Sequence, residues 1–213
     1  RRVDRARAII AETLSFERSA PLFVSYSAGK DSAVMLDLVR EQAPDIEARI
    51  ALWPESEVIG NFTEVISAMR ARGANVVACH MDRQSIDESV PDKWHRLATH
   101  QPASGYFVGL RREESAHRRI SLARFGPIHE IRSGLMSGYL RVAPIADWSL
   151  DDVAAWIVTH DTPVLDTYEA LGLEERTATR IVVRAKDECM SQLAQTRPWA
   201  LAQLRRGYPD DIV

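Results

Sequence analysis

Cysteine is scarce in this sequence, since Cys79 and Cys189 are the only two among 213 residues. Two thiolates cannot supply the full set of cysteine ligands of an iron–sulfur cluster. Two widely separated cysteines also do not form the disulfide framework of a small secreted domain. We therefore expect a protein without an iron–sulfur cluster that works in a reducing, cytoplasmic environment.

Long apolar runs are also missing. No segment approaches the roughly 20 apolar residues that a membrane-spanning helix needs, and no signal peptide is evident, so we expect no membrane association. The net charge of −3 gives the chain no overall basic character. Charge therefore does not support a nucleic-acid partner, although the basic segment 111–141 leaves one open.

What the sequence does contain is an alternation of strand-like and helix-like segments. The short apolar runs of strand type are 21–27, 47–53, 74–81, 105–110 and 139–145. Apolar residues at helical spacing occupy 3–18, 31–42 and 58–73, and Ser149-Leu150-Asp151-Asp152 has the form of a capping box that opens another helix. This alternation predicts an α/β fold with a mostly parallel, five-stranded sheet, helices on both faces and a short helical C-terminal tail.

The stretch SYSAGKDS, residues 25–32, follows the first predicted strand and leads into a helix. In an open α/β sheet, the free amides of such a helix N-terminus favour an anionic ligand. Gly29 permits close approach of the backbone, Lys30 supplies a positive charge, and Asp31 can cap the helix, orient Lys30 or hold Mg²⁺ between phosphates. The hydroxyl groups belong to Ser25, Ser27 and Ser32. The same residues also suit a solvated turn, because serine and aspartate are good helix caps.

A second polar segment, YFVGLRREESAHRR at 106–119, follows the fourth predicted strand. Arginines in this position can form paired hydrogen bonds with phosphate or sulfate oxygens, and the candidates are Arg111, Arg118 and Arg119. Glu114 and Arg118 lie four residues apart. The segment therefore also fits a solvated helix start with an internal ion pair.

These motifs carry a family resemblance. SxGKDS resembles the PP-loop of the ATP pyrophosphatase (adenine nucleotide alpha hydrolase-like) superfamily, usually SGGKDS, with Ala28 in place of the first glycine. GLRxxES…R resembles the second signature of the phosphoadenylylsulfate (PAPS) reductase family within it, and RVAPIADWSLDDVAAWI at 141–157 and Tyr168…Gly172 are similar to its later segments. We expect Trp148 and Trp156 of the third motif to be structural.

The resemblance implies a Rossmann-type fold of the adenine nucleotide alpha hydrolase-like kind, with a PP-loop nucleotide-binding domain at 1–175 and a helical tail at 176–213 packed on or beside it. It implies an enzyme that binds ATP with Mg²⁺ and cleaves the bond between the α and β phosphates. The products would be pyrophosphate and AMP or an adenylylated acceptor, in sulfur metabolism or nucleic-acid modification.

The resemblance also assigns residues to this chemistry. Lys30, Asp31, Arg111 and Arg118 would be catalytic, with Asp31 the metal ligand. The nucleotide contacts would be Ser25, Ser27, Ala28, Gly29, Lys30, Asp31, Ser32, Trp53, Arg111 and Arg119.

The chain departs from the family pattern in two places. Ala28 reduces the room for phosphate, and the turn is expected to keep its form if residue 28 has a negative φ. Reductases of the family use a nucleophilic cysteine in a C-terminal ECG-type motif, whereas this chain has Glu188-Cys189-Met190. Two alternatives follow: a thiol-dependent reductase of PAPS or adenylylsulfate (APS) acting through Cys189, and a non-catalytic nucleotide-binding subunit that works with a partner protein or DNA. Beside the adenine nucleotide, a protein partner or a homodimer is left open.

Overall fold

The computed structural model describes residues 1–82, 93–174 and 186–207. Within these residues a six-stranded sheet has the order β3-β2-β1-β4-β6-β5. The strands are β1 (Leu22–Tyr26), β2 (Glu47–Leu52), β3 (Asn75–His80), β4 (Gly105–Val108), β5 (Ile128–Glu130) and β6 (Leu140–Val142). All neighbouring pairs are parallel except β5 and β6, which are antiparallel. The predicted α/β class and mostly parallel sheet are confirmed.

The prediction of five strands was one short. The predicted runs form β1, β2, β3, β4 and β6, and the additional strand is β5 at the sheet edge. It has three residues, directly after Pro127, and none of them is fully buried. So short a segment shows no periodicity, and its position depends on antiparallel pairing with β6.

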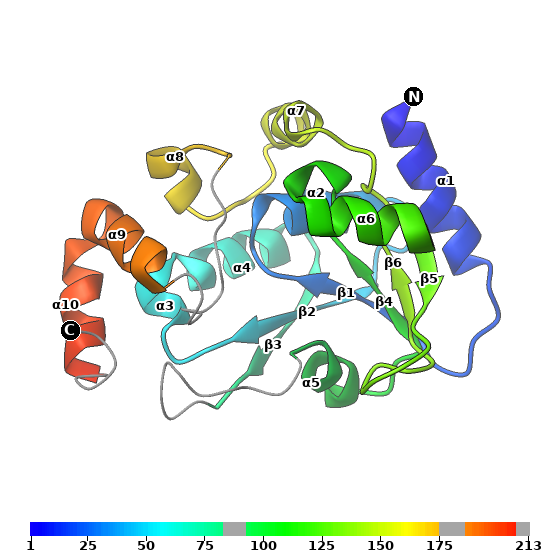
Figure 1. Ribbon diagram of the computed structural model, residues 1–213, viewed down its shortest axis with the longest axis horizontal. Helices are drawn as coiled ribbons and strands as arrows, with labels where there is room; N and C mark the ends of the chain where they lie inside the picture. Colours follow the sequence, from blue (N-terminus) through cyan, green and yellow to red (C-terminus); the bar gives the residue numbers. More distant parts are fainter. Residues whose placement is uncertain (83–92, 175–185, 208–213) are drawn as a thin grey trace.

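Helices cover both faces of the sheet. One face carries α1 (Arg2–Leu14), α2 (Lys30–Arg40), α4 (Phe62–Ala71) and α7 (Leu150–His160). The other carries α5 (Lys93–His100) and α6 (Ala116–Phe125). Figure 1 shows α5 on the opposite side of the strands from α2 and α7. Along β1, Phe23 packs on the α5 side and Val24 on the α2 side, so its continuous apolar run reflects burial on both faces.

The predicted helix 58–73 is divided into α3 (Ser56–Ile59) and α4. Gly60 between them is extended, with φ −162° and ψ 168°, and Asn61 takes the N-cap position of α4. A Cβ on residue 60 would lie 2.8 Å from the Phe62 ring. The helix therefore stops where a close contact requires glycine, a tertiary constraint that helical spacing does not reveal.

The capping box predicted at the start of α7 is present. The Ser149 hydroxyl accepts a hydrogen bond from the Asp152 amide at 3.2 Å, and the Asp152 carboxylate accepts one from the Ser149 amide at 2.6 Å. Trp148 and Trp156, on either side of this helix start, are buried with their ring centroids 5.8 Å apart. Both belong to the main core, which agrees with the structural role expected for them.

The C-terminal tail contains α9 (Lys186–Thr196) and α10 (Pro198–Gly207). It lies beside α3 and α8 (Thr167–Leu171), at one end of the sheet (Figure 1). Leu193, Ala200 and Leu204 join the main core. The domain boundary near residue 175 stays a prediction. Among the described helices, none has the length and apolar character that crossing a bilayer requires.

Candidate nucleotide-binding site

The loop between β1 and α2 forms a tight turn with Ala28 in a left-handed conformation. Its φ is +56°, and its side chain is buried. The condition under which the turn was expected to form, a negative φ at residue 28, is not met, yet the turn forms. A left-handed alanine costs on the order of 1 kcal/mol because Cβ crowds the following carbonyl oxygen. The turn forms in spite of this cost because the surrounding hydrogen bonds hold it.

Those hydrogen bonds centre on Ser32. Its hydroxyl donates to the Gly29 carbonyl at 2.9 Å and accepts from the Ser27 amide at 3.1 Å. The Ser27 hydroxyl lies 3.0 Å from it as well. Ser25 lies below the loop, buried in β1. The serine hydroxyls predicted to contact a nucleotide thus first stabilise the loop itself.

The N-terminus of α2 offers backbone donors. Within the part of the chain that the structure describes, the amides of Gly29, Asp31 and Ser32 have no hydrogen-bond acceptor. The Lys30 amide donates to the Tyr168 hydroxyl at 3.3 Å. Amides at a helix N-terminus, together with the helix dipole, favour an anionic group. The loop therefore has the geometry of a phosphate site.

Asp31 joins the loop to the arginine segment. Its Oδ1 accepts from Nε of Arg111 at 2.6 Å, and its Oδ2 lies 3.6 Å from Nζ of Lys30. Lys30 and Arg111 are only 4% and 3% exposed, respectively. Nζ of Lys30 also lies 5.1 Å from the centroid of the Tyr168 ring. Arg111 also pairs with Glu113 at 2.9 Å, so two buried cations and two carboxylates meet beside the open amides.

Two residues of this arrangement were not singled out from the sequence. Tyr168 contacts Lys30 from α8, more than 130 positions along the chain. Gly109 follows β4, and a Cβ there would lie 2.7 Å from the Asp31 carbonyl carbon and oxygen. Gly109 thus lets β4 approach the start of α2. The resembling segments Tyr168…Gly172 and GLR contained the signal, but only the fold shows what the two residues touch.

The arginines of the second motif lie in three different places. Arg111 is buried at the loop, and its Nη1 also lies 2.9 Å from Glu113. Arg118, in α6, pairs with Glu114 and lines a cavity on the α5 side of the sheet. Arg119 is exposed and lines a separate surface hollow with Arg112. The sequence placed these arginines in one group, and the structure brings only Arg111 to the loop.

Trp53 was predicted to lie against adenine, but the structure places it in the core. Its ring is 3% exposed and packs in the cluster on the α5 side with Cys79 and Met81. A ring so covered has no free face for a base, and its packing accounts for an aromatic residue at the end of β2.

Asp31 does not provide a metal site of its own. Both of its oxygens face cations, and the described residues contain no group of three or more His, Cys, Asp or Glu side chains suited to a metal ion. Mg²⁺ takes oxygen ligands and is commonly held through substrate phosphates. The residues present therefore fit magnesium that is carried by a nucleotide, not magnesium that is held by the protein.

The two cysteines lie in different elements, Cys79 in β3 and Cys189 in α9. Cys79 is buried in β3, and burial raises the pKa of its thiol to about 11. Cys189 belongs to α9, but its side chain lies outside the described residues.

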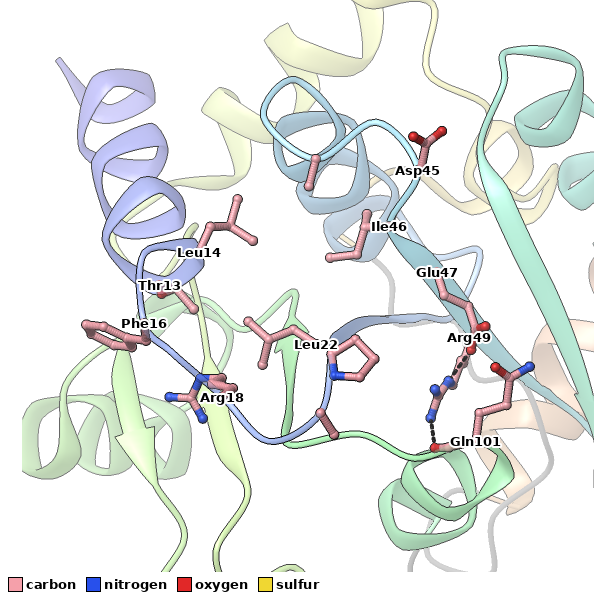
Figure 2. Close-up of a pocket in the computed structure, with 13 residues that line it drawn as sticks. Thr13, Leu14, Phe16, Arg18, Leu22, Asp45, Ile46, Glu47, Arg49 and Gln101 are labelled. Carbon is pink, nitrogen blue, oxygen red and sulfur yellow. Dashed lines mark hydrogen bonds and ion pairs between the residues drawn. The ribbon is translucent and has the colours of Figure 1, made fainter.

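A cavity of about 520 Å³ lies at the other end of the sheet, near the amino ends of β1 and β2. Figure 2 shows Leu14, Leu22 and Ile46 pointing toward it and Arg49 bonded at its rim. Nη1 of Arg49 donates to the carbonyl oxygens of Leu97 and Gln101 at the end of α5, and Nε pairs with Glu47. Arg49 is therefore used in holding α5, and this cavity has no part in the loop chemistry.

Comparison with known proteins agrees with this geometry. The family model described as phosphoadenosine phosphosulfate reductase domain matches residues 21–171, a span that contains the loop, Arg111 and Tyr168. Among curated proteins, no sequence matches the chain.

Solved structures show the same fold at low identity. FMN adenylyltransferase from Candida glabrata, in complex with FMN and an ATP analogue, is 15% identical over 79% of this chain and 60% of its own, with a TM-score of 0.61. PAPS reductase from Candida auris, in a phosphate complex, is 14% identical over 81% of this chain and 86% of its own, with a TM-score of 0.56.

A U34-tRNA thiolase from Methanococcus maripaludis, with its [4Fe-4S] cluster, is 13% identical over 98% of this chain and 78% of its own, with a TM-score of 0.50. This chain thus spans about 60% of the length of the adenylyltransferase. Likeness at these identities establishes the fold.

Proposed function

The chain belongs to the phosphoadenosine phosphosulfate reductase domain family, whose model covers residues 21–171, and from this membership we propose that it is an enzyme that cleaves ATP between the α and β phosphates. It would transfer the adenylyl group to an acceptor and release pyrophosphate. The family and the structural neighbours named above are enzymes, among them an adenylyltransferase and a PAPS reductase.

The observation that supports this proposal is the meeting of Lys30, Asp31 and Arg111 beside the open amides of α2. A triphosphate is the kind of ligand that uses several amide donors at once beside a buried lysine and a buried arginine. Such preorganised donors act strongly in a site with little water, because no dipoles need to reorient during the reaction.

In the reaction we propose, the amides of Gly29, Asp31 and Ser32 and the ammonium group of Lys30 hold the β and γ phosphates. Arg111 lies toward the α phosphate, and Asp31 keeps the two cations in place. An acceptor oxygen forms a bond to the α phosphorus as the bond to the bridging oxygen breaks, and pyrophosphate leaves with the bonding electron pair. Lys30 stabilises the charge that develops on pyrophosphate. Magnesium bound to the nucleotide would supply further charge neutralisation.

This chemistry needs positioning and charge more than a covalent intermediate. It does not use a cysteine, in contrast to the alternative of a thiol-dependent PAPS or APS reductase. Cys79 is buried and its thiol is protonated at neutral pH, so only Cys189 remains for that alternative.

The test is incubation of the protein with ATP and Mg²⁺, with and without sulfate, FMN, tRNA or a thiol, while pyrophosphate and AMP are measured. We expect pyrophosphate release with at least one acceptor and its loss in Lys30→Ala. Arg206→Ala, an exposed cation of α10, is the matched control. ATP binding without pyrophosphate under every condition would favour the non-catalytic subunit. Sulfite from PAPS and a thiol, abolished by Cys189→Ser, would favour the reductase.

A further inference from the structure

The cavity of about 520 Å³ near the amino ends of β1 and β2 has the dimensions of a second ligand site. Its lining residues fall within 13–22 and 43–49, together with Gln101, and we call it the amino-end cavity. Pockets that enclose small molecules usually have volumes of about 300–1,000 Å³. The nucleotide loop follows the carboxyl end of β1, so a ligand in the amino-end cavity would not compete with ATP.

The middle of the amino-end cavity is apolar. Leu14, Leu22 and Ile46 point toward it from the end of α1, the start of β1 and the segment before β2 (Figure 2). Leu22 and Ile46 are half-buried where they pack against the main core, and Leu14 is 37% exposed. A ligand with an apolar body would remove the exposed surface of these side chains from water, which favours binding.

Arg18 supplies a positive charge on one side of the cavity. Its guanidinium group has no hydrogen-bond acceptor and no ion-pair partner among the described residues, and its Nε atom is buried. The guanidinium carbon lies 5.6 Å from the centroid of the Phe16 ring, a contact that occupies the ring but supplies no acceptor for the N–H groups. The terminal nitrogens of Arg18 are therefore open to an anionic group, and a carboxylate can accept two hydrogen bonds from them.

The acidic residues of the cavity do not oppose an anion beside Arg18. Glu47 pairs with Arg49, and both residues lie across the cavity from Arg18 (Figure 2). Asp45 lies on that far side as well. Of the two arginines that line the cavity, Arg18 is the one whose charge is not already balanced by a carboxylate.

We propose that the amino-end cavity binds a small apolar carboxylic acid, whose carboxylate pairs with Arg18 and whose apolar body lies between Leu14, Leu22 and Ile46. One guanidinium group balances the single charge of a carboxylate, whereas a phosphate monoester carries about −1.5 to −2 at pH 7. The last turn of α1 borders the cavity, and the negative end of its dipole opposes a second negative charge. The proposal does not rest on the proposed function, which concerns the opposite end of the sheet.

Binding is tested by calorimetry with octanoate as the probe. Octanol has the same chain without a charge, octylamine has the opposite charge, and acetate is the carboxylate alone. We expect octanoate to bind at a single site, at least about tenfold more tightly than octanol, octylamine or acetate. From hexanoate to octanoate to decanoate, the affinity should rise by about fourfold for each methylene group until the cavity is filled.

Two variants test the two parts of the site. Arg18→Gln should weaken octanoate binding by about tenfold or more and remove the advantage of octanoate over octanol. Leu14→Gln, at the end of α1, should weaken octanoate and octanol alike, because it removes apolar surface and no charge. Arg206→Gln changes an exposed arginine of α10 and is the matched control, which should bind every probe as the wild type does.

Nuclear magnetic resonance places the bound probe and shows that each variant is folded. Octanoate should shift the backbone amide signals of residues 13–22 and 43–49 and leave those of the nucleotide loop, residues 27–32, unchanged. Octanoate that binds Arg18→Gln as tightly as the wild type, or that shifts only signals elsewhere, would overturn the site. The absence of saturable binding at millimolar concentrations would do so as well.

Two further measurements fix the ligand class and separate this proposal from the proposed function. Octyl phosphate that binds more tightly than octanoate would overturn the assignment to a carboxylic acid. Lys30→Ala should abolish pyrophosphate release and bind octanoate as the wild type does, whereas Arg18→Gln should lose octanoate and keep pyrophosphate release. If no acceptor ever yields pyrophosphate but octanoate binds through Arg18, the proposed function fails and the amino-end cavity stands as a ligand site.

Discussion

Nε of Arg111 lies 2.6 Å from Oδ1 of Asp31, although the two residues are 80 positions apart in the sequence. Both belong to motifs that were recognised separately, and the hydrogen bond shows that the motifs form one site. Since Asp31 also faces Lys30, one carboxylate orients both buried cations. The first prediction concerns this carboxylate.

Asp31→Asn should destabilise the protein by on the order of 3 kcal/mol, because both buried cations lose a carboxylate partner and Arg111 keeps only Glu113. ATP should restore part of this loss, since its phosphates replace the missing negative charge. Urea unfolding with and without ATP measures both effects, and Asp45→Asn at an exposed position is the control. A variant as stable as the wild type, or one that ATP stabilises no more than the wild type, would contradict the arrangement.

Gly109→Ala should impair the loop more than the fold. A Cβ there would lie 2.7 Å from the Asp31 backbone, so the start of α2 must shift and the amides lose their alignment. We expect pyrophosphate release to fall by about tenfold or more. Gly138→Ala is the comparison, because residue 138 has φ +87° but no atom within 4 Å of the added Cβ. It should cost about 1 kcal/mol of stability and leave activity intact.

Substitutions of Tyr168 separate its ring from its hydroxyl. Tyr168→Phe keeps the ring beside Lys30 and removes the acceptor of the Lys30 amide, so stability should change by no more than about 1 kcal/mol and ATP should bind at least as well. Tyr168→Ala removes a buried ring and should cost about 3 kcal/mol. ATP affinity and thermal unfolding report the two effects. Weaker ATP binding in Tyr168→Phe would mean that the hydroxyl serves the nucleotide directly.

Cys79 should be unreactive toward iodoacetamide in the folded protein at pH 8. The thiolate is the reactive form, and a pKa raised to about 11 keeps the thiol protonated at that pH. Raising the pH toward that value should accelerate alkylation, and unfolding in denaturant should remove the protection. Mass spectrometry of the peptides that contain Cys79 and Cys189 measures each site separately. Rapid native labelling of Cys79 would overturn the assignment.

Ala28→Gly should have little effect on stability and a favourable effect on ATP. Glycine removes the strain of a left-handed alanine, about 1 kcal/mol, but it also gives the unfolded chain more freedom and removes a buried methyl group. These contributions nearly cancel. The loop should then admit phosphate more closely and lower the KM for ATP. Ala28→Val, whose branched side chain fits φ +56° poorly, should raise that KM.

The sequence predicted the features that depend on local patterns. The short apolar runs became β1, β2, β3, β4 and β6, and the Ser149 capping box opens α7 as expected, because each is determined by neighbouring residues. The features it did not predict depend on distant contacts. They include the break at Gly60, the approach of Gly109 to Asp31 and the contact of Tyr168 with Lys30.

In the candidate site, too, the features set by local sequence were predicted and those set by distant contacts were not. The loop and Arg111 were found from motifs, but the positive φ of Ala28 and the burial of Trp53 were not, since both are set by packing. Arg141 opens the segment 141–157 recognised in the sequence, but its neighbour across the sheet was not predicted. Its relation to Tyr106 arises from the register of β4 and β6.

Leu110 and Arg111, which follow β4, are consecutive residues whose side chains lie on opposite sides of the chain. Consecutive residues of an extended segment project to opposite sides, so Leu110 packs in the cluster on the α5 side and Arg111, whose backbone is extended, reaches Asp31. Inserting or deleting one residue at this point would exchange the two sides. An arginine would then enter the apolar cluster on the α5 side, and a leucine would meet the carboxylate. Homologues that keep the Asp31–Arg111 pair are therefore expected to vary in the identity of residue 110 before they vary in the number of residues between β4 and α6.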